Sequence, residues 1–157
     1  MSVDQLHEDV DARAGELARW HAQRLQCRRG CFDCCVDDLS VFEVEADRIR
    51  AGAADVLAST PHPEGRCAFL GSEGDCRIYA LRPYVCRTQG LPLRWLDHDA
   101  QAEYRDICPK NEEGEPIEEL LDEECWTLGE VEEKLADLQL ERHGQLRRVK
   151  LRELFRS

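Results

Sequence analysis

The chain has 157 residues, among them 33 Asp and Glu, 21 Lys and Arg, nine cysteines and ten aromatic side chains. A chain of this length can bury one core of modest size, so we expect a single domain over residues 1–157. The formal net charge of −12 opposes nucleic-acid binding, because phosphate backbones recruit basic surfaces, and no apolar run approaches the roughly 20 residues of a membrane span.

The N-terminal residues are acidic and polar, without the basic start and apolar run of a secretory signal. We therefore expect a cytoplasmic protein, in a compartment that keeps thiols reduced. The odd number of cysteines fits this expectation, because it does not suit a complete framework of disulfides. Clustered cysteines in such a protein predict metal ligands or redox groups.

The first segment, residues 1–26, is predicted to form an N-terminal helix. Its apolar side chains recur at three- and four-residue steps from Val3 to Leu25, which is the period of an amphipathic helix. Ser2 and Gln5 form a capping box, in which each side chain can satisfy a free backbone donor of the first turn.

A second helix is expected after the first four cysteines. Ser40 and Glu43 make another capping box, and the helix is predicted to run to about Leu57. Residues 66–110 follow neither the helical nor the strand period, and glycine and proline interrupt them repeatedly. We expect loops and short helical turns there, held by the cysteines rather than by packing.

The segment after the cysteine-rich region, residues 109–157, is predicted to be acidic at first and helical later. Residues 111–133 carry eleven acidic and no basic side chains, and a short acidic helix is expected over 116–124. This stretch is either a solvated helix face or a docking surface for a basic partner protein. Residues 134–157 have a net charge of +4, so this tail can fold back onto the acidic stretch.

The last helices are predicted from capping and apolar spacing. Thr127 and Glu130 repeat the capping box ahead of an apolar face, and Gly144 divides this helix from a final basic one. The elements together predict a mainly α fold. It is a small single domain, in which an irregular, metal-stabilised centre over residues 27–108 is flanked by N- and C-terminal helices.

Eight of the nine cysteines lie within residues 27–108. They are Cys27, Cys31, Cys34, Cys35, Cys67, Cys76, Cys86 and Cys108. A thiolate is a soft anionic ligand, and several thiolates held together repel one another unless a cation lies between them. The clustering therefore predicts a site for zinc, iron or an iron–sulfur cluster.

The spacing of the cysteines bears on the kind of metal site. Zinc ribbons usually present two Cys-x2-Cys pairs, whereas this chain has one, Cys31 and Cys34. Cys34 and Cys35 are adjacent, and successive side chains usually point apart. They are therefore suited to ligate two separate metal centres, or two irons of one cluster. Cys27, Cys31 and Cys34 also share the spacing of radical S-adenosylmethionine enzymes, but the repeated strand–helix pattern of their partial barrel is absent.

Three segments combine cysteines with particular neighbours. They are Cys27-x3-Cys31-x2-Cys34-Cys35, then Cys67-Ala68-Phe69-Leu70 leading into Cys76-Arg77-Ile78-Tyr79, and Arg82-Pro83-x2-Cys86-Arg87. In this order they resemble the YkgJ-type cysteine-cluster proteins, a family described as zinc- or iron-chelating. The resemblance spans about residues 27–108, and it is specific because residues other than cysteine match as well.

The resemblance implies that about eight cysteines chelate iron or zinc. These are Cys27, Cys31, Cys34, Cys35, Cys67, Cys76, Cys86 and Cys108. Cys125 is left over, and we expect it to be a buried free thiol. Arg82 and Arg87 bracket Cys86 and are predicted to donate hydrogen bonds to the thiolates. The family also includes a domain of a much longer flagellin lysine methylase, for which an iron–sulfur cluster and S-adenosylmethionine are implicated.

These features give three hypotheses of function. The first is a cytoplasmic metal-binding protein that chelates iron, with a 4Fe–4S cluster favoured over single ions and zinc as the competitor. The second is an enzyme that uses S-adenosylmethionine at the cluster, as the methylase resemblance suggests. The third is a zinc-stabilised protein-interaction module. No Ser-His-Asp set, phosphate loop or pair of carboxylates indicates metal-free catalysis, so we lean against an enzyme.

Overall fold

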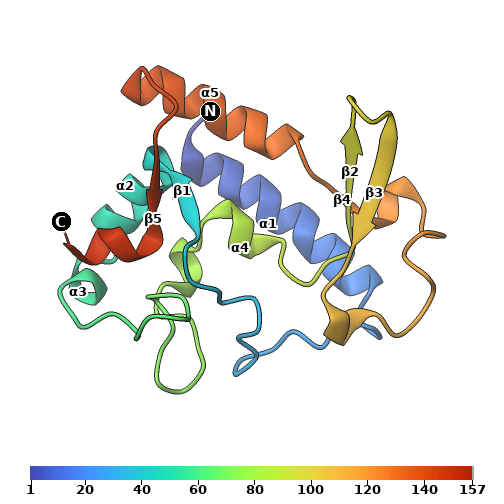
Figure 1. The fold of residues 1–157 in the computed structure, drawn as a ribbon, viewed down its shortest axis with the longest axis horizontal. Coiled ribbons are helices and arrows are strands. Elements are labelled where there is room, and N and C mark those ends of the chain that lie inside the picture. Colours follow the sequence, from blue (N-terminus) through green and yellow to red (C-terminus); the bar gives the residue numbers. More distant parts are fainter. Residues whose placement is uncertain (157) are drawn as a thin grey trace.

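The computed structural model describes residues 1–156 and combines helices with two small sheets (Figure 1). The α-helices are α1 (Val3–Trp20), α2 (Glu43–Gly52), α3 (Ala54–Leu57), α4 (Tyr84–Arg87) and α5 (Glu130–His143). The strands are β1 (Ser40–Phe42), β2 (Leu93–Asp97), β3 (Ala102–Asp106), β4 (Trp126–Thr127) and β5 (Arg148–Lys150). Short 3-10 helices cover Tyr79–Leu81, Pro109–Asn111, Asp122–Glu124 and Leu151–Arg156.

The prediction of a mainly α fold was wrong. Helices make up 42% and strands 13% of the chain. One sheet pairs β1 with β5, and the other has the order β3-β2-β4, in which β2 pairs antiparallel with β3 and parallel with β4. The strands span two to five residues and mostly join segments far apart in the chain, so no local period reveals them.

The long helix α1 lies along the middle of the molecule, between α5 and α4 in the view of Figure 1. The Ser2 half of the predicted capping box is confirmed, because the Ser2 hydroxyl accepts the Gln5 N–H at 3.1 Å, whereas the Gln5 side chain donates to Asp9 instead. The helix ends at Trp20, earlier than expected. The next residues turn away because the His21 imidazole donates to the Glu124 carbonyl and the buried Arg24 donates to the Asn111 carbonyl.

The capping box expected at Ser40 does not form. Ser40 belongs to β1 and faces Lys150 of β5, so helix α2 begins directly after the strand, with Phe42 at its N-cap. The Val44 N–H donates to the buried amide oxygen of Gln139 in α5 at 3.0 Å. A side chain from a distant helix therefore replaces the local cap.

Residues 66–110 are more regular than expected. They contain β2 and β3, which form a hairpin with Trp95 opposite Tyr104, and the short helix α4. Segment 66–110 also supplies buried apolar side chains. These include Ala68, Phe69, Leu70, Ile78, Tyr84, Leu91 and Ile107. The segment thus contributes to the core, although its sequence lacks a sustained period.

The C-terminal third also differs from the expectation. Residues 116–121 form turns rather than a helix, and only Asp122–Glu124 are helical, as a 3-10 turn. Thr127 lies in β4, and α5 begins after Gly129, whose N–H donates to the Glu132 carboxylate at 2.7 Å. After Gly144 the chain forms strand β5 and a 3-10 helix in place of the expected basic helix.

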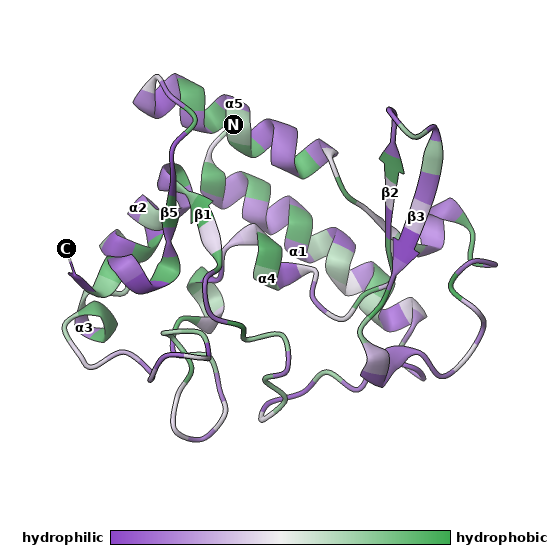
Figure 2. Ribbon diagram, in the orientation of Figure 1, coloured by the Kyte–Doolittle hydropathy of each residue, from purple (hydrophilic) through white to green (hydrophobic). Residues whose placement is uncertain are grey.

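Apolar side chains gather in two core clusters, and the helices in Figure 2 accordingly alternate hydrophobic (green) and hydrophilic (purple) residues. The first cluster is built on α1 and α5, from residues such as Leu6, Leu17 and Leu135. The second cluster lies between α2, β5 and the cysteine-rich loops, around Ile49 and Phe69. No helix within residues 1–156 has both the length and the apolar character to cross a membrane.

Candidate metal centre

Five of the eight predicted ligands are linked by electrostatic influence on one another, and we call them the five-cysteine group. It consists of Cys34, Cys35, Cys67, Cys76 and Cys86. The Cys35 carbonyl accepts the Cys67 N–H at 3.0 Å, which joins the first and second cysteine segments. Cys76 pairs with Leu70 in an isolated β-bridge, and Cys67 and Cys76 pack against the second core cluster. Cys86 lies in α4.

The sulfurs of the five-cysteine group influence one another. The Cys35 thiol donates to the Cys34 sulfur, which holds the pKa of Cys34 below its ordinary value and raises the pKa of Cys35. Burial raises the pKa of Cys67 and Cys76 and raises that of Cys86 to about 12, and neighbouring sulfurs add to the shift of Cys86. Mutual repulsion of this kind is what a bound cation would relieve.

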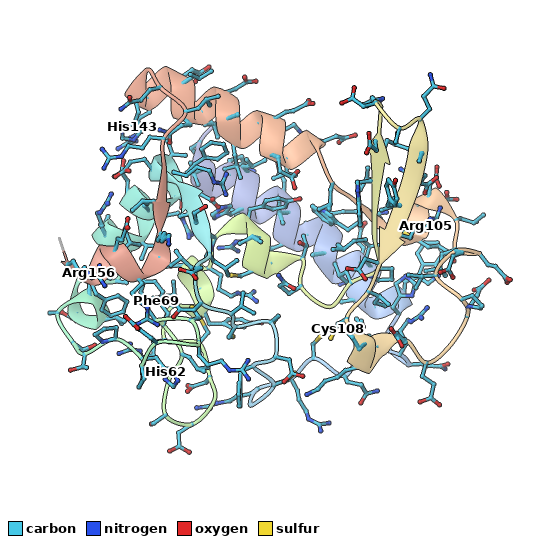
Figure 3. The ribbon with its side chains drawn as sticks, in the orientation of Figure 1. His62, Phe69, Arg105, Cys108, His143 and Arg156 are labelled. Atoms are coloured by element: carbon cyan, nitrogen blue, oxygen red, sulfur yellow. The ribbon has the colours of Figure 1, made fainter. Side chains whose placement is uncertain are left out.

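The other three predicted ligands, Cys27, Cys31 and Cys108, adjoin the 3-10 helix Pro109–Asn111, and we call them the three-cysteine group. Figure 3 labels Cys108 at the start of this helix. The Asn111 amide donates to the Cys27 sulfur at 3.4 Å, and the Lys110 ammonium lies 3.8 Å from the Cys31 sulfur. Cys108 is the N-cap of this 3-10 helix, and its carbonyl accepts the Asn111 N–H. The structure thus divides the eight predicted ligands into five and three.

Asn111 organises the three-cysteine group. Its side chain is fully buried, accepts the Gln26 N–H at 2.7 Å and donates to the Gly90 carbonyl at 2.9 Å. This role was not predictable from the sequence, because a single Asn in a loop has no characteristic pattern. Gly90 has φ +89°, and a Cβ atom built there would lie 2.3 Å from the Cys27 sulfur.

Replacing Gly90 with alanine is therefore expected to displace Cys27 and to lower the free energy of unfolding by about 1–3 kcal/mol. Gly65→Ala is the matched control, since Gly65 has φ +99° and an added Cβ meets no atom within 4 Å. Chemical denaturation measures the stability of both variants. Gly65→Ala reports the cost of backbone strain alone, whereas Gly90→Ala adds the clash with the Cys27 sulfur. Equal losses in the two variants would contradict the close approach of Gly90 to Cys27.

The two arginines predicted to donate hydrogen bonds to the thiolates donate to carbonyl and carboxylate oxygens instead. Arg87 is buried, pairs with Asp11 of α1 and donates to the carbonyls of Arg82 and Ala80. Arg82 donates to the Tyr79 carbonyl, and its guanidinium lies 3.7 Å from the centroid of the Tyr79 ring. Its positive charge acts to lower the pKa of Cys86, against the larger effect of burial. Direct support of the thiolates by these arginines stays a prediction.

Cys125 lies outside both groups. It is buried, as expected, and the Arg105 guanidinium approaches its sulfur at 3.6 Å. All nine cysteines are free thiols. Among residues 1–156, no group of three or more His, Cys, Asp or Glu side chains is already gathered closely enough to hold a metal ion.

Arg152 and Asp37 connect two loops near the cysteines, a role not predicted from the sequence. We call their contact the clamp. Arg152 contacts the Asp37 carboxylate through two nitrogens, at 3.0 and 3.1 Å. The same guanidinium donates to the carbonyls of His62, Pro63 and Arg66. Because Asp37 follows Cys35 and Arg66 precedes Cys67, this clamp joins the loop that carries Cys35 to the loop that carries Cys67.

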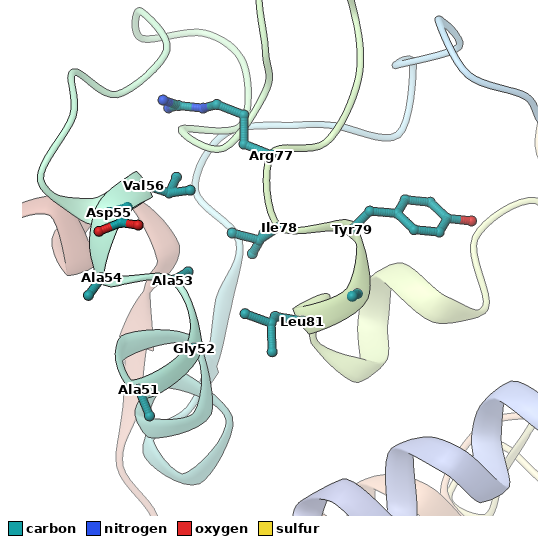
Figure 4. A pocket seen from close by; sticks show the side chains of 11 residues that line it. Ala51, Gly52, Ala53, Ala54, Asp55, Val56, Arg77, Ile78, Tyr79 and Leu81 are labelled. Carbon is teal, nitrogen blue, oxygen red and sulfur yellow. The ribbon is translucent and has the colours of Figure 1, made fainter.

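A shallow pocket of about 420 Å³ lies beside this region, between the α2–α3 turn and residues 77–81 (Figure 4). Its wall is formed mainly by small and apolar residues such as Ala53, Ile78 and Leu81, and no cysteine lines it. Arg77 borders it, but the guanidinium is already bonded to the Ser59 hydroxyl and the Ala68 carbonyl. The donors for a metal are therefore outside this pocket.

Comparison with known proteins identifies the cysteine-rich region. The model of the CxxCxxCC family, described as a "putative zinc- or iron-chelating domain", matches residues 26–109. This range contains both cysteine groups and excludes Cys125. The searches of curated proteins and of solved structures returned no match.

Proposed function

The chain belongs to the CxxCxxCC family, and on this premise we propose that it is a cytoplasmic iron-binding protein whose five-cysteine group holds a 4Fe–4S cluster. The family description names iron or zinc, the two metals expected from the sequence. The observation that carries the proposal is the collection of five free thiols from three separate segments, of which Cys67 and Cys76 pack against the second core cluster.

The donor set fits iron better than a single zinc ion. Zinc in structural sites takes four ligands in a tetrahedron, whereas the five-cysteine group offers five thiols, two of them adjacent. A 4Fe–4S cluster also takes four cysteines, but each ligates a different iron, so the adjacent Cys34 and Cys35 can ligate two irons of one cluster. When bound, such a cluster can supply one-electron chemistry or simply hold the loops. The protein itself would supply the thiolate ligands and hold them in position.

Metal binding would also move the loops. Because the sulfurs are not yet gathered to coordinating distance within residues 1–156, the loops that carry Cys34 and Cys67 would close on the metal. The three-cysteine group supplies the remaining predicted ligands, near the positive charge of Lys110. The nine free thiols are consistent with a reducing compartment.

The test is anaerobic purification, followed by analysis of iron, zinc and acid-labile sulfide and by a visible spectrum. We expect a brown protein with stoichiometric iron and sulfide. Cys67→Ala should lose the cluster, whereas Cys125→Ala, the matched control outside both groups, should keep it. A colourless protein with stoichiometric zinc would exclude the iron–sulfur proposal, and it would favour a zinc-stabilised module.

Metal binding should release protons, because coordinating thiols lose them. Burial raises the pKa of Cys67, Cys76 and Cys86, so these thiols are protonated in the metal-free protein at neutral pH. The affinity for metal is therefore expected to rise with pH, by up to about tenfold per pH unit for each proton released. Anaerobic zinc titrations by calorimetry, in two buffers that differ in ionisation enthalpy, count these protons. An affinity independent of pH would contradict a thiol ligand set.

A further inference from the structure

The hairpin of β2 and β3 lies at the opposite end of the molecule from the C-terminus (Figure 1), and its register places two aromatic residues opposite each other. Trp95 lies opposite Tyr104, with ring centroids 5.7 Å apart and nearly parallel planes. Tyr104 is 45% exposed. An aromatic pair that packs against no core is a candidate binding surface, because stacked exposed rings offer their faces to a partner.

Two carboxylates flank the aromatic pair on the same face. Since side chains alternate along a strand, Asp97 and Asp106 point to the face that carries Trp95 and Tyr104. We call these four residues the aromatic–acidic face. On the opposite face, Arg94 and Arg105 are already paired with Glu103 and Asp122. The unpaired negative charge is therefore concentrated beside the rings.

The surrounding chain strengthens this charge. Residues 97–133 carry fifteen Asp and Glu against two cationic side chains, Arg105 and Lys110. Among the carboxylates of this fully described stretch, only Glu103 and Asp122 form ion pairs, while Lys110 pairs with Asp33 outside it. A field of this sign attracts cationic partners and repels nucleic acid.

The basic tail of the same chain does not neutralise this region. Its cationic side chains pair instead with carboxylates near α2 and the loop after Cys35. The pairs are Arg142 and His143 with Asp47, Arg147 with Glu43, Lys150 with Asp38, and Arg152 with Asp37. The basic tail up to Arg156 therefore does not fold back onto residues 111–133, although their opposite charges would favour it. The acidic stretch remains available to another molecule.

We propose that the aromatic–acidic face docks an Arg- or Lys-rich extended segment of a partner protein. β3 is an edge strand, so such a segment can lie along it and present alternate side chains to the face. A guanidinium or ammonium group then stacks on Tyr104 and Trp95, between the carboxylates of Asp97 and Asp106. This docking is independent of the metal proposed above.

The probe is a labelled synthetic peptide of about ten residues with arginine at alternate positions, which matches the side-chain period of a strand. Fluorescence anisotropy on the full chain should show binding that weakens with salt, and a peptide with glutamine in place of arginine should not bind. Tyr104→Ala should weaken binding by about two- to fivefold. Leu96→Ala, an exposed change on the opposite face of the hairpin, should leave it unaltered.

A second comparison distinguishes the effect of the two carboxylates of the aromatic–acidic face from that of the general negative charge of the acidic stretch. The double variant Asp97→Asn/Asp106→Asn should weaken binding and flatten its salt dependence more than Glu118→Gln/Glu119→Gln, which removes two exposed carboxylates elsewhere in the acidic stretch. Equal effects of the two double variants, or wild-type binding by Tyr104→Ala, would overturn the proposal. Self-association that Tyr104→Ala abolishes would also overturn it, because a second copy would then cover the face.

Discussion

Replacing Phe69 with alanine is expected to lower the free energy of unfolding by about 3–5 kcal/mol, the cost of truncating a buried aromatic side chain. Phe69 is 1% exposed, and its ring centroid lies 4.8 Å from that of Phe155. Its carbonyl accepts the Arg77 N–H, which fixes the turn between Cys67 and Cys76. The variant removes the centre of the second core cluster, and chemical denaturation of the metal-free protein measures the loss.

Tyr79→Ala provides the matched control. Tyr79 is also aromatic and lies in the same cysteine-rich segment, but it is 64% exposed. Its truncation should cost less than about 1 kcal/mol, mainly through the lost contact with the Arg82 guanidinium. If the two variants were equally stable, packing around Phe69 would not be what holds this segment.

The Phe69 experiment also distinguishes two ways of ordering the cysteine-rich segment. The lack of an amphipathic pattern in residues 66–110 predicted that the metal holds this segment. The structure shows Phe69 and Ile78 within the second core cluster and Tyr84 and Leu91 within the first. A large loss in the metal-free Phe69→Ala protein would mean that packing positions the thiols before metal arrives, and that the metal adds stability by binding to a framework already folded.

Features set by local residues were predictable from the sequence. The amphipathic spacing and Ser2 cap of α1 are interactions within a few residues of one another, and both are present. The burial of Cys125 followed from its position outside the cysteine motifs. Membership of the CxxCxxCC family followed from cysteines and their immediate neighbours.

Features set by distant residues were not predictable in this way. Ser40 and Thr127 have the local signature of a helix cap, but each pairs in a strand with a segment from elsewhere in the chain. The capping signature is a weak energetic preference of about 1 kcal/mol, which such tertiary contacts can outweigh. The division of the cysteines into five and three likewise depends on Asn111 and Arg152, whose partners lie about 85 to 115 residues away.

Replacing Arg152 with alanine is expected to lower the free energy of unfolding by about 2–3 kcal/mol. The guanidinium is mostly buried, and its loss leaves the Asp37 carboxylate without its cation and three loop carbonyls without their donor. The loops that carry Cys35 and Cys67 would then lose their common anchor. Chemical denaturation gives the stability, and the iron content of anaerobically purified protein reports whether the loops still present their thiols.

The neighbouring pair of Lys150 with Asp38 supplies the matched control, because it joins the same two segments but both side chains are largely exposed. Lys150→Ala should therefore change stability by less than about 1 kcal/mol. Arg152→Lys keeps the charge but loses the two-nitrogen contact with Asp37, so it should recover only part of the loss. If Arg152→Ala and Lys150→Ala behaved alike, the clamp would be only a surface ion pair.

The acid dependence of Arg152→Ala tests the clamp by a second route. The Arg152 guanidinium holds the pKa of Asp37 below the ordinary value of 3.8, with help from the Gly65 N–H. A carboxyl group whose pKa is lowered by folding stabilises the protein above its unfolded pKa and loses this effect as pH falls through the folded pKa. The stability difference between the wild type and Arg152→Ala should thus be constant from neutral pH down to about pH 5 and shrink below about pH 4. A difference that persisted unchanged in strong acid would assign the effect of Arg152 to its bonds with the loop carbonyls, and Asp37→Asn would then be nearly neutral.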